Sequence, residues 1–262
     1  MRAMNSNEIR ETYLNFFKEH GHTIMPSASL LVLNDPTLLW NNAGVTPLKK
    51  YFDGSMIPVN KRLTSCQKCI RTNDIESVGD DTHHTFFEML GNFSIGDYFK
   101  DEAIEMAYEL LTSKKYFGFP KEKLYFTVYA SDNDAYNKWL SLGVDENHIV
   151  RLESNFWEIG EGPCGPDSEI FYDRGEEFDK EGLGVRLLKE EIDNMRYVEI
   201  WNNVFSQFNS KEGVKREDYK ELPSKNIDTG MGLERMTCVL QGVTSSYDTD
   251  LFKKIIGKIE EL

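Results

Sequence analysis

The sequence predicts an α+β domain built around a mostly antiparallel β-sheet that is flanked by helices. Extended, apolar-rich segments follow one another directly along much of the chain, and helical segments separate groups of them. With 262 residues, 40% of them apolar and 12% aromatic, the chain is long enough to bury a large core.

The first expected element is an amphipathic helix that begins after Asn5. Asn5 is a good N-cap, and Glu8 completes the pattern of a capping box. The helix ends at Gly21. Its apolar residues recur at helical spacing: Ile9, Tyr13, Phe16 and Phe17.

The next third of the chain is expected to be mainly extended. Residues 23–33 are extended around Pro26, Asn34-Asp35-Pro36 forms a turn, and a polar loop joins strands at 63–76 and 84–90. Helical periodicity then runs from Asp101 through Tyr116. A strand at 123–130, a helix at 132–143 and a strand at 148–152 form a β-α-β unit.

The last hundred residues are expected to begin with a loop, GEGPCGPDSE, before a short strand, EIFYD. The charged stretch 174–196 is a solvated excursion with one amphipathic turn, and 197–209 is a strand. A glycine segment, NIDTGMGLERM, opens a helix through Leu240, and Asp248 or Asp250 caps a final helix.

Charge and composition exclude some classes of function. A net charge of −14 makes the chain a poor candidate for gripping a long polyanion, although it suits a small phosphorylated ligand. There is no apolar run long enough for a membrane span and no secretory signal, so we expect a cytoplasmic protein without a membrane partner.

The cysteines raise the question of a metal. Cys66 and Cys69 have zinc-knuckle spacing, but His83, His84 or Cys164 could complete such a site only through the fold. No second pair follows at the usual distance, so we expect reduced cysteines and no zinc.

Two expected strands bring an arginine and an aromatic ring together. Arg71 suits an anion because its planar fork contacts two oxygens at once, and Phe87 beside it can stack on a heterocycle. The alternative is a surface salt bridge for Arg71, with Phe86 or Phe87 in the core.

The glycine segment fits neither common phosphate-binding spacing. Gly230 and Gly232 are followed by Arg235, where a third glycine or a lysine would stand in the phosphate loops. A guanidinium plane one turn into a helix can cover a ring. The segment therefore predicts a purine clamp, with the base between Phe87 and Arg235.

These segments together resemble a known family. Arg71 with HHTFFEMLGNFSIGDYFK and the later DTGMGLER resemble the second and third signature motifs of class II aminoacyl-tRNA synthetases. SASLLVLNDPTLLWNNAG, SNFWEIGEGPCGP and EIWNNVFSQFN are similar to segments of the alanyl-tRNA synthetases, in the same order over essentially the whole chain.

The resemblance implies activation of alanine with ATP, by way of alanyl-adenylate, for transfer to tRNA(Ala). It implies that Arg71, Asp228 and Arg235 are catalytic and that Glu199 binds Mg²⁺. The implied ATP-binding residues are Arg71, His84, Phe87, Glu88, Met89, Gly232 and Arg235. The implied alanine-binding residues are Arg71, Trp157, Asn202, Val204, Asp228 and Gly230.

Several of these residues have structural alternatives. Trp157 could belong to the core, Asp228 could cap the following helix, and Glu199 could be a solvated strand carboxylate. Two departures from the family stand out. The loop before TFFEML carries Asp80 and Asp81 where a basic residue is usual, and Asp167 stands where a second cysteine is common.

The resemblance also implies a domain division. Residues 1–242 correspond to the adenylation domain, and 243–262 begin a helical tRNA-recognition region in which this chain stops. We therefore expect weak or absent tRNA binding, and a monomer. Two other functions stay open: activation of an amino acid for a non-tRNA acceptor, and a non-catalytic binding paralogue.

Overall fold

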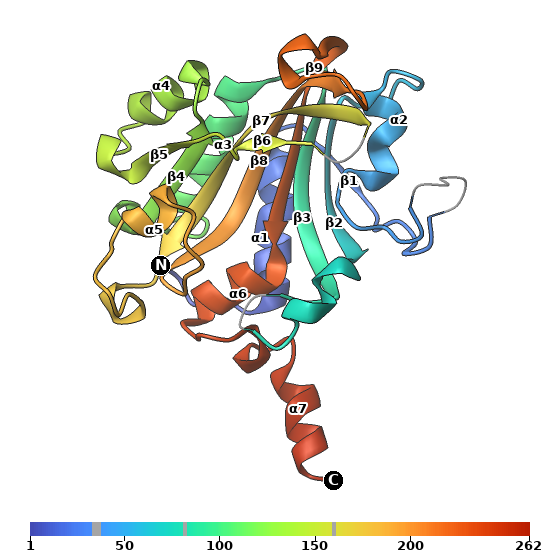
Figure 1. The fold of residues 1–262 in the computed structure, drawn as a ribbon. Helices are drawn as coiled ribbons and strands as arrows, with labels where there is room; N and C mark the ends of the chain where they lie inside the picture. The colour runs from blue at the N-terminus through green and yellow to red at the C-terminus, as the bar shows by residue number, and fades with distance from the viewer. Residues whose placement is uncertain (33–37, 81–82, 159–160) are drawn as a thin grey trace.

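The computed structural model describes residues 1–32, 38–80, 83–158 and 161–262, and it is organised around one large sheet (Figure 1). The expected turn at Asn34-Asp35-Pro36 and the loop residue Asp81 lie outside these ranges. The strand order is β1-β2-β3-β9-β8-β7-β4-β5, with β6 paired to β7. Among the strand pairs of the described residues, β1–β2 and β4–β5 are parallel and the others are antiparallel, which confirms the predicted mostly antiparallel sheet.

The strands and helices have the following bounds. The strands are β1 Thr23–Met25, β2 Arg62–Ile70, β3 Phe86–Ile95, β4 Leu124–Tyr129, β5 Ile149–Leu152, β6 Phe156–Trp157, β7 Gly162–Asp173, β8 Tyr197–Ser210 and β9 Lys220–Gly232. The helices are α1 Ser6–Glu19, α2 Lys49–Phe52, α3 Lys100–Thr112, α4 Asn133–Ser141, α5 Arg186–Lys189, α6 Leu233–Gln241 and α7 Lys253–Glu260.

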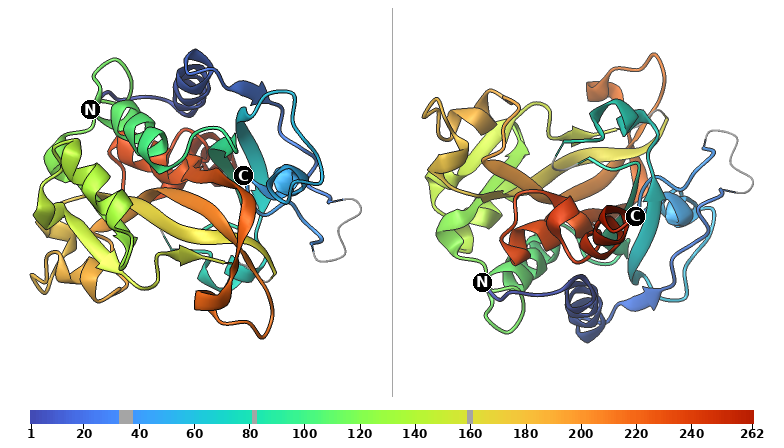
Figure 2. Two further views of the ribbon diagram at one scale, coloured as in Figure 1. Left: turned by 90° about the horizontal axis from the view of Figure 1, so that it is seen from above. Right: turned by 90° about the horizontal axis from the view of Figure 1, so that it is seen from below.

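Helices cover one face of the sheet and leave most of the other face open. The long helices α1 and α3 lie behind the sheet in Figure 1, and the two views in Figure 2 show them on the same side. The main core fills this layer with side chains from α1, α3, α4, α6 and the central strands. A smaller cluster lies under α2, on the open face.

Local signals predict α1 and the β-α-β unit correctly. Asn5 and Glu8 form the capping box, with Asn5 Oδ1 accepting the Glu8 amide at 3.0 Å. The apolar stripe of α1 is fully buried. The expected β-α-β unit is β4-α4-β5, whose strands are parallel, and its helix is capped by Asp132.

The strand β7 corrects one expectation. The segment GEGPCGPDSE was expected to be a loop, but β7 begins at Gly162 and continues to Asp173. Pairing with β8 overrides the local glycine and proline signals, with a register shift between Cys164 and Asp167. Gly165 is required at this irregularity, because a Cβ there would come within 2.0 Å of the Phe205 carbonyl oxygen.

The glycine segment corrects another expectation. Residues from Asn226 to Gly232 are the end of the strand β9 and not a glycine turn, and α6 starts only at Leu233. The thirteen-residue strand β9 pairs with β3 on one side and with β8 on the other. The backbone therefore arrives at α6 fully extended, between two strands that line the open face.

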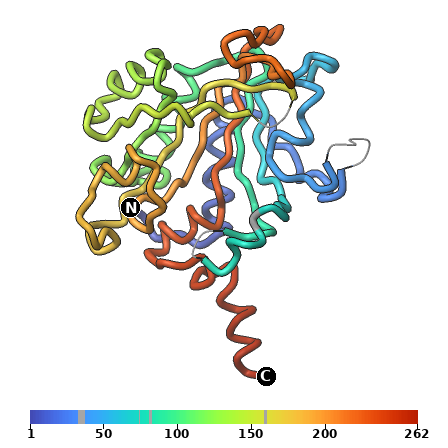
Figure 3. Tube along the Cα trace, in the orientation of Figure 1, coloured from blue at the N-terminus to red at the C-terminus, as the bar shows by residue number. Residues whose placement is uncertain are grey.

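Two helix ends also differ from expectation. α3 ends at Thr112 and not at Tyr116, because the chain reverses there and the Phe117 amide donates back to the Leu110 carbonyl. No side chain caps α7, and Asp250 instead accepts hydrogen bonds from Ser6 at the start of α1. Figure 3 shows α7 projecting from the body of the molecule.

Candidate active site

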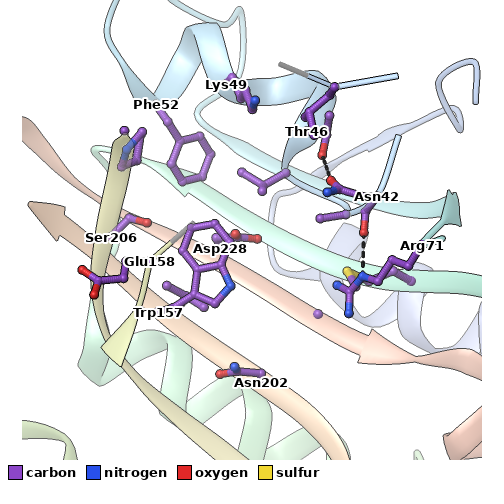
Figure 4. Close-up of a pocket in the computed structure, with 18 of the residues that line it drawn as sticks. Asn42, Thr46, Lys49, Phe52, Arg71, Trp157, Glu158, Asn202, Ser206 and Asp228 are labelled. Carbon is purple, nitrogen blue, oxygen red and sulfur yellow. Dashed lines mark hydrogen bonds between the residues drawn. The ribbon is translucent and has the colours of Figure 1, made fainter. Parts of the chain in front are cut away.

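A cavity of about 1130 Å³ lies on the open face of the sheet. Its floor is formed by β3, β9, β8 and β7, and its cover includes Asn42 to Phe52, Trp157 and the segment that follows β8 (Figure 4). It brings together nearly every residue that the sequence singled out. The predicted residues that line it are Arg71, His84, Phe87, Met89, Trp157, Glu199, Asn202, Val204, Asp228, Gly230, Gly232 and Arg235.

Arg71 lies at one end of this cavity, immediately after β2. Its amide donates to the Thr85 carbonyl at 2.9 Å, which extends the pairing of β2 and β3 by one step. Its side-chain Nε donates to the Asn42 carbonyl at 3.0 Å (Figure 4). Among the described residues no salt bridge joins Arg71 to a carboxylate.

Phe87 lies beside this arginine. The Arg71 guanidinium carbon is 5.1 Å from the centre of the Phe87 ring. We expected either Phe86 or Phe87 in the core, and neither is buried: Phe86 is 47% exposed, and Phe87 is half-buried in the cavity wall. One large ring at the mouth of a cavity, next to a guanidinium, suits a planar heterocycle that carries negative charge.

Arg235 approaches from the first turn of α6 and pairs with Glu199 on β8. The distance from Arg235 Nη1 to Glu199 Oε2 is 2.9 Å, and the two side chains are 26% and 35% exposed. Glu199 is therefore a half-buried, paired carboxylate and not a simply solvated one. No sequence motif predicted this pair, since 36 residues separate its members.

Asp228 projects into the cavity from β9. It stands on the strand opposite Val204 and Phe93, and the N-cap of α6 is Gly232, so the helix-cap alternative is wrong. Burial raises the pKa of Asp228 to about 7, and no cation among the described residues offsets this rise. A buried carboxylate without a cation is complementary to a ligand ammonium group.

Small and aromatic side chains shape the space around Asp228. Trp157 is half-buried and lines the cavity, so it does not belong to the core. Gly230 leaves room for Met89, whose sulfur would lie 2.9 Å from a Cβ at that position. The Gly44 amide also donates to the Met89 sulfur at 3.3 Å, a contact that no sequence motif predicted.

Glu88 is the one predicted site residue that does not line the cavity. It lies between Phe87 and Met89 on β3, so its side chain is on the opposite face of the sheet. There its Oε1 and Oε2 accept hydrogen bonds from Arg10 on α1, at 2.6 and 2.9 Å. The structure therefore removes Glu88 from the expected set of ATP-contacting residues.

His84 lines the cavity but faces the connection to α7. It shares a 2.8 Å hydrogen bond with the Ser246 hydroxyl, and its ring stacks on Phe252 with centres 5.1 Å apart. Burial lowers the pKa of His84, so the ring is neutral at neutral pH. Its neighbour His83 is held by Asp80, one of the two aspartates that distinguish this loop.

A second group of carboxylates at the cavity floor was not predicted. Both lie on β7: Asp167 is buried beneath the cavity, and Glu169 is half-buried and lines it. Burial raises the pKa of Asp167 to about 6, and burial together with Glu199 and Asp167 raises the pKa of Glu169. The segment GPCGPDSE carries both residues, but its glycines and prolines predicted a loop.

The cysteines do not approach one another as ligands. Cys66 and Cys69 lie three apart on β2, where side chains point to opposite faces of the sheet. The Cys66 thiol donates to Glu88 at 3.1 Å. Within the described ranges, no three His, Cys, Asp or Glu side chains gather as a metal site, and no cysteine is in a disulfide.

Comparison with known proteins identifies the family. The profile described as "tRNA synthetases class II (A)" matches residues 8–262. The chain belongs to this family. Solved class II synthetases share the fold. A pyrrolysyl-tRNA synthetase from Desulfitobacterium hafniense has a TM-score of 0.50 and 10% identity, and the match covers 95% of this chain and 74% of that one. The apo histidyl-tRNA synthetase of S. aureus has a TM-score of 0.50 and 13% identity, and the match covers 93% of this chain and 68% of that one.

Curated relatives within this class are much more similar in sequence. The alanine–tRNA ligase of Lactococcus lactis subsp. cremoris (strain MG1363) is 62% identical over 263 residues, and that of Streptococcus sanguinis (strain SK36) is 60% identical. Each match covers 100% of this chain and 30% of the relative. The chain therefore spans less than a third of the length of these ligases.

The helices of this class II chain do not resemble membrane spans. In the part of the chain that the structure describes, none combines the length and the apolar character needed to cross a bilayer.

Proposed function

We propose that this chain activates alanine with ATP, forming alanyl-adenylate and releasing pyrophosphate. One observation carries the proposal: a single cavity has an arginine and an aromatic ring at one end, and at the other, beside small residues, a buried carboxylate that pairs with no cation among the described residues. The names of the relatives, alanine–tRNA ligase, support alanine as the amino acid.

In this proposal ATP occupies the end of the cavity at Phe87 and Arg235. Adenine stacks on Phe87 and is covered by the Arg235 guanidinium, with Met89 and Gly232 shaping the pocket around the base. His84 lies beside the phosphates. As a neutral ring it contributes a hydrogen bond and no charge.

Alanine occupies the end at Asp228. The Asp228 carboxylate binds the ammonium group, while Trp157, Val204 and Gly230 leave space for one methyl group and Asn202 contributes an amide. Before alanine binds, the raised pKa of Asp228 leaves it partly protonated, so binding an ammonium group also favours release of that proton.

Arg71 acts where the two substrates react with each other. The alanine carboxylate attacks the α-phosphorus in line, the new bond forms to a carboxylate oxygen, and the bond to pyrophosphate breaks. Arg71 neutralises charge on the α-phosphate and positions the carboxylate, fixed in place by the Asn42 carbonyl. No covalent enzyme nucleophile is needed.

A magnesium ion fits one carboxylate of this cavity. Mg²⁺ commonly binds one or two protein carboxylates together with substrate phosphates and water, and it neutralises phosphate charge. Glu199 would hold it through the oxygen that does not face Arg235. This donor set does not require the three-residue cluster that is absent among the described residues.

The proposal extends to the acceptor and the setting. Transfer of alanine to tRNA(Ala), a cytoplasmic monomer, and a boundary after residue 242 between the adenylation domain and a tRNA-recognition region remain proposals for the whole protein. The acidic charge of the chain supports weak tRNA binding by residues 1–262 alone.

Binding of a non-hydrolysable adenylate analogue tests the proposed activity. Alanyl-sulfamoyl-adenosine should bind one molecule per chain in isothermal titration calorimetry, and both ATP and alanine should compete with it. The leucyl analogue is the matched control, and it should not bind because its side chain exceeds the space at Trp157 and Val204. Equal binding of the two analogues would contradict the proposed amino acid.

A further inference from the structure

A buried carboxylate beneath the cavity controls the direction of a cavity-lining amide. We propose that Asp167 is a positioning residue that orients Asn202, so that the Asn202 amide oxygen faces the ammonium group of the amino-acid substrate. The inference rests on the proposed function, because it concerns how the amino-acid end of the cavity is built.

Two asparagine side chains donate hydrogen bonds to the buried Asp167 carboxylate, one to each oxygen. Asp167 is 4% exposed. Its Oδ1 accepts a hydrogen bond from Asn155 Nδ2 at 2.9 Å, and its Oδ2 accepts one from Asn202 Nδ2 at 3.1 Å. The Asp167 amide also donates to the Asn155 carbonyl at 2.9 Å, so both its backbone and its side chain are held.

An ionised carboxylate leaves Asn202 only one favourable orientation. A carboxylate accepts hydrogen bonds and cannot donate them, whereas an asparagine amide has a donor end and an acceptor end. Rotating the amide by half a turn would place its oxygen against the carboxylate oxygens of Asp167. Asp167 therefore turns the Asn202 NH₂ group toward itself and the oxygen away.

That oxygen has no partner in the described part of the protein. Asn202 Oδ1 is buried and accepts no hydrogen bond, although Asn202 lines the cavity. Asn202 pairs with Gly230, and Val204, two residues further along β8, pairs with Asp228. In the view of Figure 4, the Trp157 ring lies between Asn202 and Asp228.

An ammonium group matches these two acceptors. An ammonium group has three N–H donors, so it can donate to Asp228 and still have a donor for a second acceptor. A buried acceptor such as the Asn202 oxygen costs free energy until a ligand donates a hydrogen bond to it. Asp228 supplies the charge, and the oriented Asn202 supplies a second, directional contact. Burial raises the pKa of Asp167 to about 6, which still leaves it mainly ionised and orienting at neutral pH.

A double-mutant cycle on this chain tests the inference. Asp167→Asn keeps the shape but can present either a donor or an acceptor, so it no longer selects one orientation of Asn202. We expect its KM for alanine in ATP–pyrophosphate exchange to rise about tenfold, with kcat and the KM for ATP unchanged. Asn202→Ala should act similarly, and the double variant should be no worse than Asn202→Ala alone.

Asp132→Asn is the matched control, because Asp132 is also a buried carboxylate with two partners, Lys100 and the Ala135 amide, but does not line the cavity. It should lower the melting temperature without changing the KM for alanine. Independent, multiplying effects of Asp167→Asn and Asn202→Ala would overturn the inference, and so would an equal rise in the KM for ATP. A wild-type chain without alanine-dependent exchange would instead contradict the proposed function itself.

Discussion

Arg235 Nη1 lies 2.9 Å from Glu199 Oε2, so an ion pair ties the first turn of α6 to β8 across the cavity. Both side chains are partly exposed, so the pair itself adds little to the stability of the fold. Its consequence is geometric, because the carboxylate fixes the direction of the guanidinium plane that we propose lies over adenine.

Replacing this arginine should weaken ATP binding specifically. Arg235→Lys keeps the charge but loses the plane, and we expect the KM for ATP in the exchange reaction to rise about tenfold while the KM for alanine changes little. Arg186→Lys is the control, since Arg186 also pairs with a glutamate, Glu190, and both side chains are exposed. Unchanged ATP kinetics in Arg235→Lys would show that the base is not held here.

The raised pKa of Asp228 predicts a pH-dependent reaction. The carboxylate binds the ammonium group and the protonated acid does not, so kcat/KM for alanine should rise with pH and level off above about 7. Asp228→Asn should lower kcat/KM about a hundredfold, because a charged hydrogen bond is lost. In this variant kcat/KM for alanine should no longer rise with pH up to about 7. A flat wild-type profile between about pH 5.5 and 8.5 would contradict the assignment.

The same residue should destabilise the fold at high pH. The pKa of Asp228 is about 7 in the folded state and about 3.9 in an unfolded chain, so the folded state binds the proton more tightly. Its stability therefore falls as pH rises from about 4 to about 7 and stays low above that.

In urea unfolding, Asp228→Asn should be more stable than wild type by about 2–4 kcal/mol at pH 8 and nearly equal to it at about pH 4. Asp193→Asn, an exposed loop aspartate, is the control and should show no such pH-dependent difference. If Asp228→Asn were less stable at pH 8, the carboxylate would have an unrecognised partner.

Discrimination of alanine from the smaller glycine and the more polar serine should be incomplete. In the proposed function, the cavity binds the ammonium and carboxylate groups that all amino acids share, so only the size of the space at Trp157 and Val204 would discriminate among them. One methyl group is worth about 1–3 kcal/mol, so glycine should be activated about 10- to 200-fold less efficiently than alanine, and serine also detectably. An exchange assay over these three amino acids measures the ratios, and undetectable glycine and serine activation would contradict this account of selectivity.

Local sequence signals predicted those helices and strands that are specified by residues within the same short segment. The capping box and apolar stripe of α1, and the alternation of β4, α4 and β5, are properties of short segments. The motifs also predicted site residues of which nearly all line the cavity, and Arg71, Phe87 and Arg235 carry chemistry that is recognisable residue by residue.

Non-local pairing explains most of the errors. β7 and β9 contain glycines and prolines that favour turns when considered alone, and both are strands because β8 pairs with them on either side. The same strands decide that Asp228 faces the cavity and does not cap α6. The face of β3 on which Glu88 lies depends on Arg10 and the helix layer, which are distant in the sequence.

Alanine-dependent ATP–pyrophosphate exchange by wild type and Arg71→Ala tests the central claim most directly. Among the described residues, the Arg71 side chain donates a hydrogen bond only to the Asn42 carbonyl. Its replacement should therefore leave the melting temperature nearly unchanged. The account predicts exchange that requires alanine in the wild type and falls at least about a hundredfold in the variant. A folded wild type without exchange, or an Arg71→Ala variant with undiminished exchange, would contradict it.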